Sequence, residues 1–177
     1  MSERRQDLMR RRLFELEQEA ARLYVELGKL GANERLPGTY MVVEAGRFEA
    51  VVPASAVCEI VRLVEYLPAP GAPAHVLGSF IYRGTPVVAI DLARYFGAEH
   101  EPALDAHVAV LASSRPMALV TDRVRALIDT PVFAGTSAEA DDWKRSKQVV
   151  GLCSYEGRTL PIIGLGPLLA SLEAPPR

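Results

Sequence analysis

Hydrophobic positions near the N-terminus recur with the period of an α-helix. Apolar residues follow one another at alternating spacings of four and three, and strong helix formers lie between them. This heptad seam predicts an amphipathic helix over residues 1–31, followed by a linker at 32–38. A seam of this length packs on its own domain, self-associates or pairs with a partner's helix. Its members are Met9, Leu13, Leu16, Ala20, Leu23, Leu27 and Leu30.

From residue 39 onward the hydrophobic pattern changes to short β-rich runs separated by Gly and Pro. Three pairs of runs flank the dipeptides Ala45-Gly46, Arg83-Gly84 and Glu156-Gly157, and each pair predicts a hairpin. Further strands are expected at 57–64, 107–112, 117–121 and 124–128, with a helical turn at 91–96 and a closing helix at 165–172. About ten short strands with frequent turns are typical of β-sandwiches and barrels.

An internal repeat divides the β-rich region into two halves. Residues 77–96 align with residues 150–169, and the shared residues occupy strand ends and turns. Both segments follow a predicted hairpin and a third strand. The repeat predicts two similar β-barrels in tandem, each of about five strands, which share a core because each half alone is small. The identities are Gly78/Gly151, Tyr82/Tyr155, Gly84/Gly157, Ile90/Ile163 and Leu92/Leu165.

Composition and charge exclude several classes of protein. The net charge is −2, whereas a general nucleic-acid-binding domain would be basic. Two cysteines, Cys58 and Cys153, are too few for a disulfide scaffold, and both lie in apolar runs typical of a reduced core. The three histidines have no metal-ligand spacing. Without a catalytic motif, signal peptide or membrane span, the sequence indicates a non-enzyme of the cytosol with no cofactor.

Two charged residues are candidate binding residues. Arg83 lies at a predicted hairpin tip, where an arginine is either a solvated turn residue or a contact to a partner surface. Glu59 is the single charge in the apolar strand around Val57 and Ile60. It is either the outward residue of the alternation or part of a binding groove, because interfaces combine apolar anchors with a charged rim. Asp91 has a simpler expected role, capping the helical turn that follows it.

An ordered set of segments resembles the CheW family of chemotaxis coupling proteins. The stretch from Val76 to Leu92, with its Gly, Arg-Gly and Asp-Leu, is similar to the family's signature. Three further segments occur in the family's order. The resemblance extends from about Thr39 to Leu172. These segments are Val57-Cys58-Glu59-Ile60, Leu119 to Val124, and Val150 to Leu165.

The resemblance implies a fold, partners and site residues. The fold is mainly β, with two tandem five-stranded SH3-like barrels sharing a core at residues 39–173, here with the added N-terminal helix and a tail at 174–177. The function implied is a non-catalytic scaffold between a CheA-type histidine kinase regulatory domain and the cytoplasmic tip of methyl-accepting chemoreceptors. Such a protein is cytoplasmic and associated with membrane-anchored arrays, without inserting into the membrane. Val57, Glu59, Ile60 and Arg83 fall on the receptor-facing or kinase-coupling residues.

Several departures from the family pattern leave other functions open. The residue two positions before the turn arginine is usually polar in the family but is Ile81 here, followed by Tyr82. Gly164 stands where the family usually has Asp or Asn, and the heptad helix is an addition. A variant adaptor of a non-flagellar pathway, whose helix binds a dedicated partner, would show such changes. A small-molecule enzyme or sensor using the groove between the barrels would need an acid–base pair beyond Glu59 and Asp91. A nucleic-acid module would need a basic strand face, yet residues 32–177 are mildly acidic.

Overall fold

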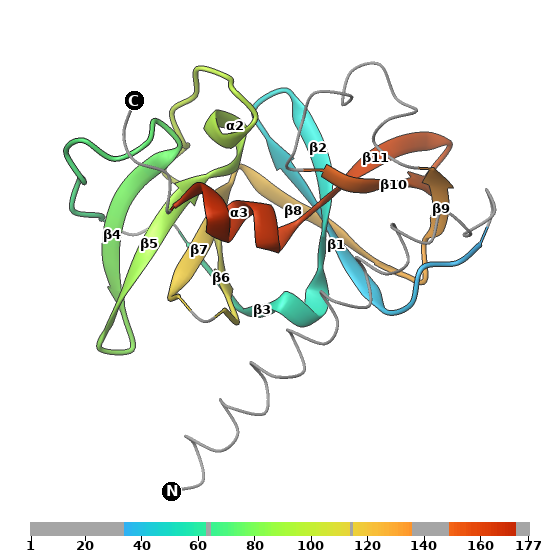
Figure 1. Cartoon of the computed structure of the whole chain (residues 1–177), viewed down its shortest axis with the longest axis horizontal. Helices are drawn as coiled ribbons and strands as arrows, with labels where there is room; N and C mark the ends of the chain where they lie inside the picture. The colour runs from blue at the N-terminus through green and yellow to red at the C-terminus, as the bar shows by residue number, and fades with distance from the viewer. Residues whose placement is uncertain (1–33, 63–64, 114, 136–148, 173–177) are drawn as a thin grey trace, which may run out of the picture.

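The computed structural model describes residues 34–62, 65–113, 115–135 and 149–172. The predicted helix and its seam lie outside these residues. In the described part the chain is mainly β and forms one six-stranded and one five-stranded sheet (Figure 1). The six-stranded sheet has the order β8 (Arg123–Asp129), β1 (Thr39–Ala45), β2 (Phe48–Pro53), β11 (Arg158–Ile163), β10 (Val149–Tyr155) and β9 (Val132–Gly135). The five-stranded sheet has the order β3 (Val57–Arg62), β6 (His107–Leu111), β7 (Met117–Thr121), β5 (Thr85–Asp91) and β4 (Val76–Tyr82).

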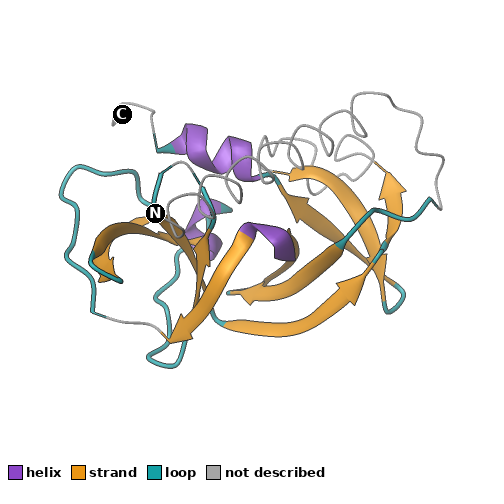
Figure 2. Cartoon of the chain, turned by 90° about the horizontal axis from the view of Figure 1, so that it is seen from below, coloured by secondary structure: helices purple, strands orange, loops and turns teal. Residues whose placement is uncertain are grey.

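Short helices follow the last strand of each repeat unit. The helix α2 (Leu92–Tyr95) follows β5, α3 (Leu165–Ser171) follows β11, and a single 3-10 turn, η1 (Ala54–Ala56), joins β2 to β3. Asp91 caps α2 as predicted, because its carboxylate accepts a hydrogen bond from the Arg94 amide at 3.1 Å. Figure 2 shows α3 lying along one side of the two groups of strands.

The predicted repeat is present in the hairpins β4–β5 and β10–β11. Each hairpin has a bulge at its equivalent glycine, Gly78 or Gly151. In each turn a charged residue and the following glycine both have positive φ, at 48° and 78° for Arg83-Gly84. This is the arrangement of a type I′ turn, whose twist matches that of the strands it joins.

The strands are nevertheless distributed differently from the expectation of one barrel from each half. The hairpin β1–β2 lies between β8 and β11 of the second half, and the hairpin β6–β7 lies between β3 and β5 of the first half. Figure 1 shows this exchange as blue strands among the orange and red ones, and yellow strands beside the green. Each sheet therefore takes its central hairpin from the opposite half of the sequence.

Three clusters of buried side chains form the core. One cluster lies within the five-stranded sheet and includes Phe80 and Val108. A second lies within the six-stranded sheet and includes Val42 and Phe133. The third combines residues of both sheets with α2 and α3, and it is the shared core that the repeat predicts. Strand β1 contributes to both the second and the third cluster, so it is buried on both faces.

Some local expectations differ from the structure. Strand β9 was not predicted from the sequence, because it is only four residues long and ends at Gly135. The first hairpin turns at Gly46-Arg47, one position later than predicted. Cys153 is buried, and burial raises its pKa to about 12. Cys58 is exposed on β3, so the expectation that both cysteines lie in the core is wrong for Cys58.

Candidate functional site

The structure brings Glu59 and Arg83 together from the two edges of the five-stranded sheet. Glu59 lies on β3 and Arg83 in the β4–β5 turn, and these strands are the first and last of the sheet. Arg83 Nη2 donates a hydrogen bond to Glu59 Oε2 at 2.7 Å. The Tyr82 hydroxyl donates to the same carboxylate oxygen, and the Arg83 guanidinium lies 5.2 Å from the centre of the Tyr82 ring. Polar contacts therefore link the two edges of the sheet.

The ion pair faces solvent. The Arg83 side chain is 75% exposed and that of Glu59 is 39% exposed. An ion pair of this exposure stabilises a fold by only about 0–1 kcal/mol. Burial and the hydrogen bond to Glu59 together raise the pKa of Tyr82, which therefore stays a hydrogen-bond donor at neutral pH. The cluster holds one acidic and one basic group at a fixed place on the surface.

The backbone conformation of the turn does not explain why residue 83 is an arginine. Arg83 has a φ of 48°, a left-handed conformation that costs most residues about 1 kcal/mol and that Asn, Asp and Gly adopt more easily. A long basic side chain is therefore not the residue that the turn geometry favours. Its contacts with Glu59 and Tyr82 direct the guanidinium towards β3.

The second barrel shows that the fold does not require the ion pair. In the repeat, Glu156 takes the place of Arg83. Strand register places Ala126 where Glu59 lies, in agreement with the approximate alignment of the sequence. The second barrel thus closes without this pair. Residues paired side by side on neighbouring strands form two equivalent rows. The row in the five-stranded sheet is Glu59, Val110, Ala118 and Ala89. The row in the six-stranded sheet is Ala126, Val42, Val51 and Ile162.

The two apolar residues predicted beside the pair lie in different environments. Ile60 is 43% exposed, whereas Val57 is partly buried and packs against the shared core. On the opposite edge, Ile81 of β4 is 67% exposed and pairs with the exposed Pro86 of β5. We call Glu59, Ile60, Ile81, Tyr82 and Arg83 the edge site.

Sequence reasoning missed the part that Tyr82 plays in this site. It treated Tyr82 only as a departure from the family pattern, since a contact between the two edges of a sheet depends on how the barrel closes. It also missed the contacts of His100, which lie elsewhere and are described below. Among the described residues, no group of three or more His, Cys, Asp and Glu side chains is placed to hold a metal ion. Nor does any described helix have the length and apolar character needed to cross a membrane.

The double-barrel fold agrees with the comparisons to known proteins. The family described as CheW-like domain matches residues 39–173, and the chain belongs to this family. The scaffolding protein TtCheW from Thermoanaerobacter tengcongensis has a similar structure, with a TM-score of 0.62 and 20% sequence identity. The similarity covers 72% of this chain and 89% of that protein. No curated protein matches the sequence. The family is one of non-catalytic chemotaxis scaffolds.

Proposed function

We propose that this protein is a non-catalytic scaffold that couples chemoreceptors to a CheA-type histidine kinase. The observation that carries the proposal is the exposed Glu59–Arg83 pair, which is absent at the equivalent position of the second barrel. A feature that the fold does not require, and that adds little stability, is available for recognition. Its place on a CheW-like domain supports a role in coupling.

The composition of the edge site suits a protein partner. Ile60 and Ile81 supply exposed apolar area beside a fixed pair of opposite charges. In protein interfaces, apolar groups supply most of the affinity, and charges at the rim fix the orientation and exclude wrong partners. The partners proposed are the kinase regulatory domain and the receptor's cytoplasmic tip. The proposal includes a location in the cytoplasm, at membrane-anchored receptor arrays.

A second proposal is a variant adaptor of a non-flagellar chemosensory pathway. It is favoured by Ile81, which is 67% exposed where a polar residue is usual in the family. An apolar group there selects a partner that also offers apolar area, because an exposed polar group opposite it would lose water without gaining a hydrogen bond. The predicted N-terminal helix would then bind a dedicated partner.

Co-purification tests the coupling function directly. The full-length protein is mixed with a CheA-type kinase and a receptor cytoplasmic fragment, each alone and together. We expect both to be retained, and Arg83→Glu to weaken retention of at least one. Glu156→Arg is the matched control, because it reverses a charge at the equivalent turn position of the other barrel. Retention of neither partner would overturn the proposal, and equal losses in the two variants would exclude the edge site.

A further inference from the structure

A second polar cluster lies where the two sheets meet, away from the edge site. The imidazole of His100 lies between two carboxylates: Nδ1 is 2.9 Å from Asp91 Oδ2, and Nε2 is 3.0 Å from Asp122 Oδ1. The Asp91 side chain is fully buried and that of His100 is mostly buried. Buried polar contacts of this kind link particular parts of the chain, because leaving one of them unpaired is costly.

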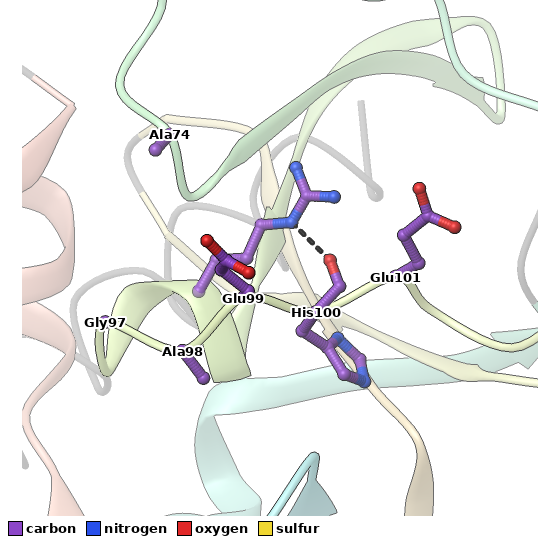
Figure 3. A pocket seen from close by; sticks show the side chains of 7 residues that line it. Ala74, Gly97, Ala98, Glu99, His100 and Glu101 are labelled. Atoms are coloured by element: carbon purple, nitrogen blue, oxygen red, sulfur yellow. Dashed lines mark hydrogen bonds between the residues drawn. The ribbon is translucent and has the colours of Figure 1, made fainter.

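The three residues connect elements of both sheets. Asp91 ends β5 of the five-stranded sheet, and Asp122 lies between β7 of that sheet and β8 of the other. Asp122 Oδ2 also accepts a hydrogen bond of 2.6 Å from the Gly46 amide, in the turn between β1 and β2. The chain of contacts therefore runs from β5 through His100 to the exchanged hairpin. Figure 3 shows His100 in the loop that follows α2. The Nε of Arg94 donates a hydrogen bond to the carbonyl oxygen of His100 at 2.6 Å.

The geometry defines the protonation state that fits. An ionised carboxylate only accepts hydrogen bonds, so each imidazole nitrogen must donate to satisfy its neighbour. Neutral histidine carries one N–H, whereas the imidazolium ion carries two. In the neutral form, one nitrogen lone pair would face a carboxylate oxygen at about 3 Å, without a proton between them. Only the charged form makes both contacts, as charge-assisted hydrogen bonds.

We propose that His100, Asp91 and Asp122 form a proton-dependent clamp that holds the exchanged hairpin β1–β2 against the five-stranded barrel. The clamp is closed when His100 is protonated. It opens at the Asp122 or the Asp91 contact when the proton is lost. His100 lines a pocket of about 650 Å³ together with Arg94, Glu99 and Glu101, so its proton can exchange with solvent.

The charges around His100 agree with this assignment. Burial opposes the charged form, but the hydrogen bonds and charges of Asp91 and Asp122 outweigh it and raise the pKa of His100 above its ordinary 6.5. Six other charged residues lie on the segments that adjoin His100. Two of them make contacts away from the imidazole: Arg47 lies over the Phe48 ring, and Glu44 binds Arg125. The six residues are Arg94 on α2, Glu99 and Glu101 in its own loop, Arg47 in the β1–β2 turn, Glu44 at the end of β1 and Arg123 at the start of β8.

The sign of the pH dependence follows from the raised pKa. A histidine whose pKa is higher in the folded than in the unfolded chain contributes stability that is complete below pH 6.5. This contribution is lost as the pH rises through the folded pKa. His75 contributes with the opposite sign, because burial lowers its pKa and acid therefore destabilises the fold through it.

Histidine NMR of the full-length protein tests the clamp. At about pH 6, below the ordinary pKa of histidine, we expect both ring nitrogens of His100 to be protonated, and we expect its pKa to lie above 6.5. Asp122→Asn should lower that pKa, and the Gly46 amide should exchange faster as His100 deprotonates. A neutral His100 at that pH, or a pKa that Asp122→Asn leaves unchanged, would overturn the proposal.

Chemical unfolding provides the second test, because it does not depend on resolving one imidazole signal. The difference in unfolding midpoint between the wild type and His100→Gln should be largest near pH 6 and should shrink by about pH 9. His75→Gln is the matched control, and its difference from the wild type should change in the opposite direction. If the difference in unfolding midpoint between the wild type and His100→Gln does not change with pH, His100 stabilises the fold without any role for its proton, and the proposal is overturned.

Discussion

At the scale of single residues, the Glu59–Arg83 pair has either a structural role or a role in recognition. The pair is exposed, adds little stability and has no counterpart in the second barrel. If its role is recognition, the sign of each charge at its place matters to the partner. If its role is only to join β3 to the β4–β5 turn, either orientation of the pair serves equally well.

Exchanging the two charges distinguishes these roles. Arg83→Glu alone should weaken partner binding about tenfold or more and change the free energy of unfolding by less than about 1 kcal/mol. The double variant Glu59→Arg with Arg83→Glu restores an internal pair but reverses its orientation. We expect binding to stay weak in the double variant, measured by calorimetric titration with the kinase regulatory domain. Recovery of binding would assign the pair a structural role.

Sequence reasoning found part of this site. Glu59 and Arg83 were predicted because each interrupts or ends an apolar strand at a place that resembles the family's coupling positions. Tyr82 and His100 were not, because the acceptors of their hydrogen bonds lie in other segments of the chain. Such contacts depend on which strand edges meet when the barrels close, and local periodicity does not encode this.

At the scale of elements, the glycines at the third position of β4 and β10 are under different constraints. A Cβ at Gly78 would lie 2.0 Å from the backbone oxygen of Leu67, and its φ of 149° is unusual for other residues. Leu67 forms a β-bridge with Ser79, so this glycine allows the chain after β3 to close the barrel against β4. A Cβ at Gly151 would instead meet the Phe133 ring at 3.0 Å, and a ring can move.

The two alanine variants should therefore differ. Gly78→Ala is expected to lower the free energy of unfolding by about 3 kcal/mol or more, because backbone must move. Gly151→Ala should cost about 1–2 kcal/mol, because the Phe133 side chain adjusts. Urea unfolding of both variants measures the difference. Equal losses would show that the contact between Leu67 and Gly78 does not constrain the barrel.

The sequence predicted these elements better than their arrangement. The three hairpins follow from turn dipeptides between apolar runs, and the repeat follows from residues at strand ends. The exchange of central hairpins does not follow, because β1 and β6 carry similar apolar patterns and either could fill either sheet. Only the complete set of strand pairings distinguishes the two arrangements.

At the scale of the molecule, the exchange makes the two barrels one unit. Neither half of the sequence contains all the neighbours of its own strands, since β2 pairs with β11 and β5 pairs with β7. Separating residues 1–104 from 105–177 within the exposed loop at Leu104 should leave two fragments that do not fold alone. Their mixture should recover the native β-sheet spectrum in circular dichroism. Cooperative unfolding by either fragment alone would contradict the prediction.

The exchanged hairpin also has a consequence for synthesis on the ribosome. Strands β1 and β2 emerge early, yet their neighbours are β8 and β11, and β11 is the last strand of the described chain. Pairings between such distant parts of a chain give a high contact order, which slows folding. Beyond its pairing with β2, strand β1 has no neighbour until β8 has emerged, and the other edge of β2 stays unpaired until β11 has emerged. A nascent chain with exposed apolar strands is prone to aggregate, so we expect this topology to increase the need for chaperones during translation.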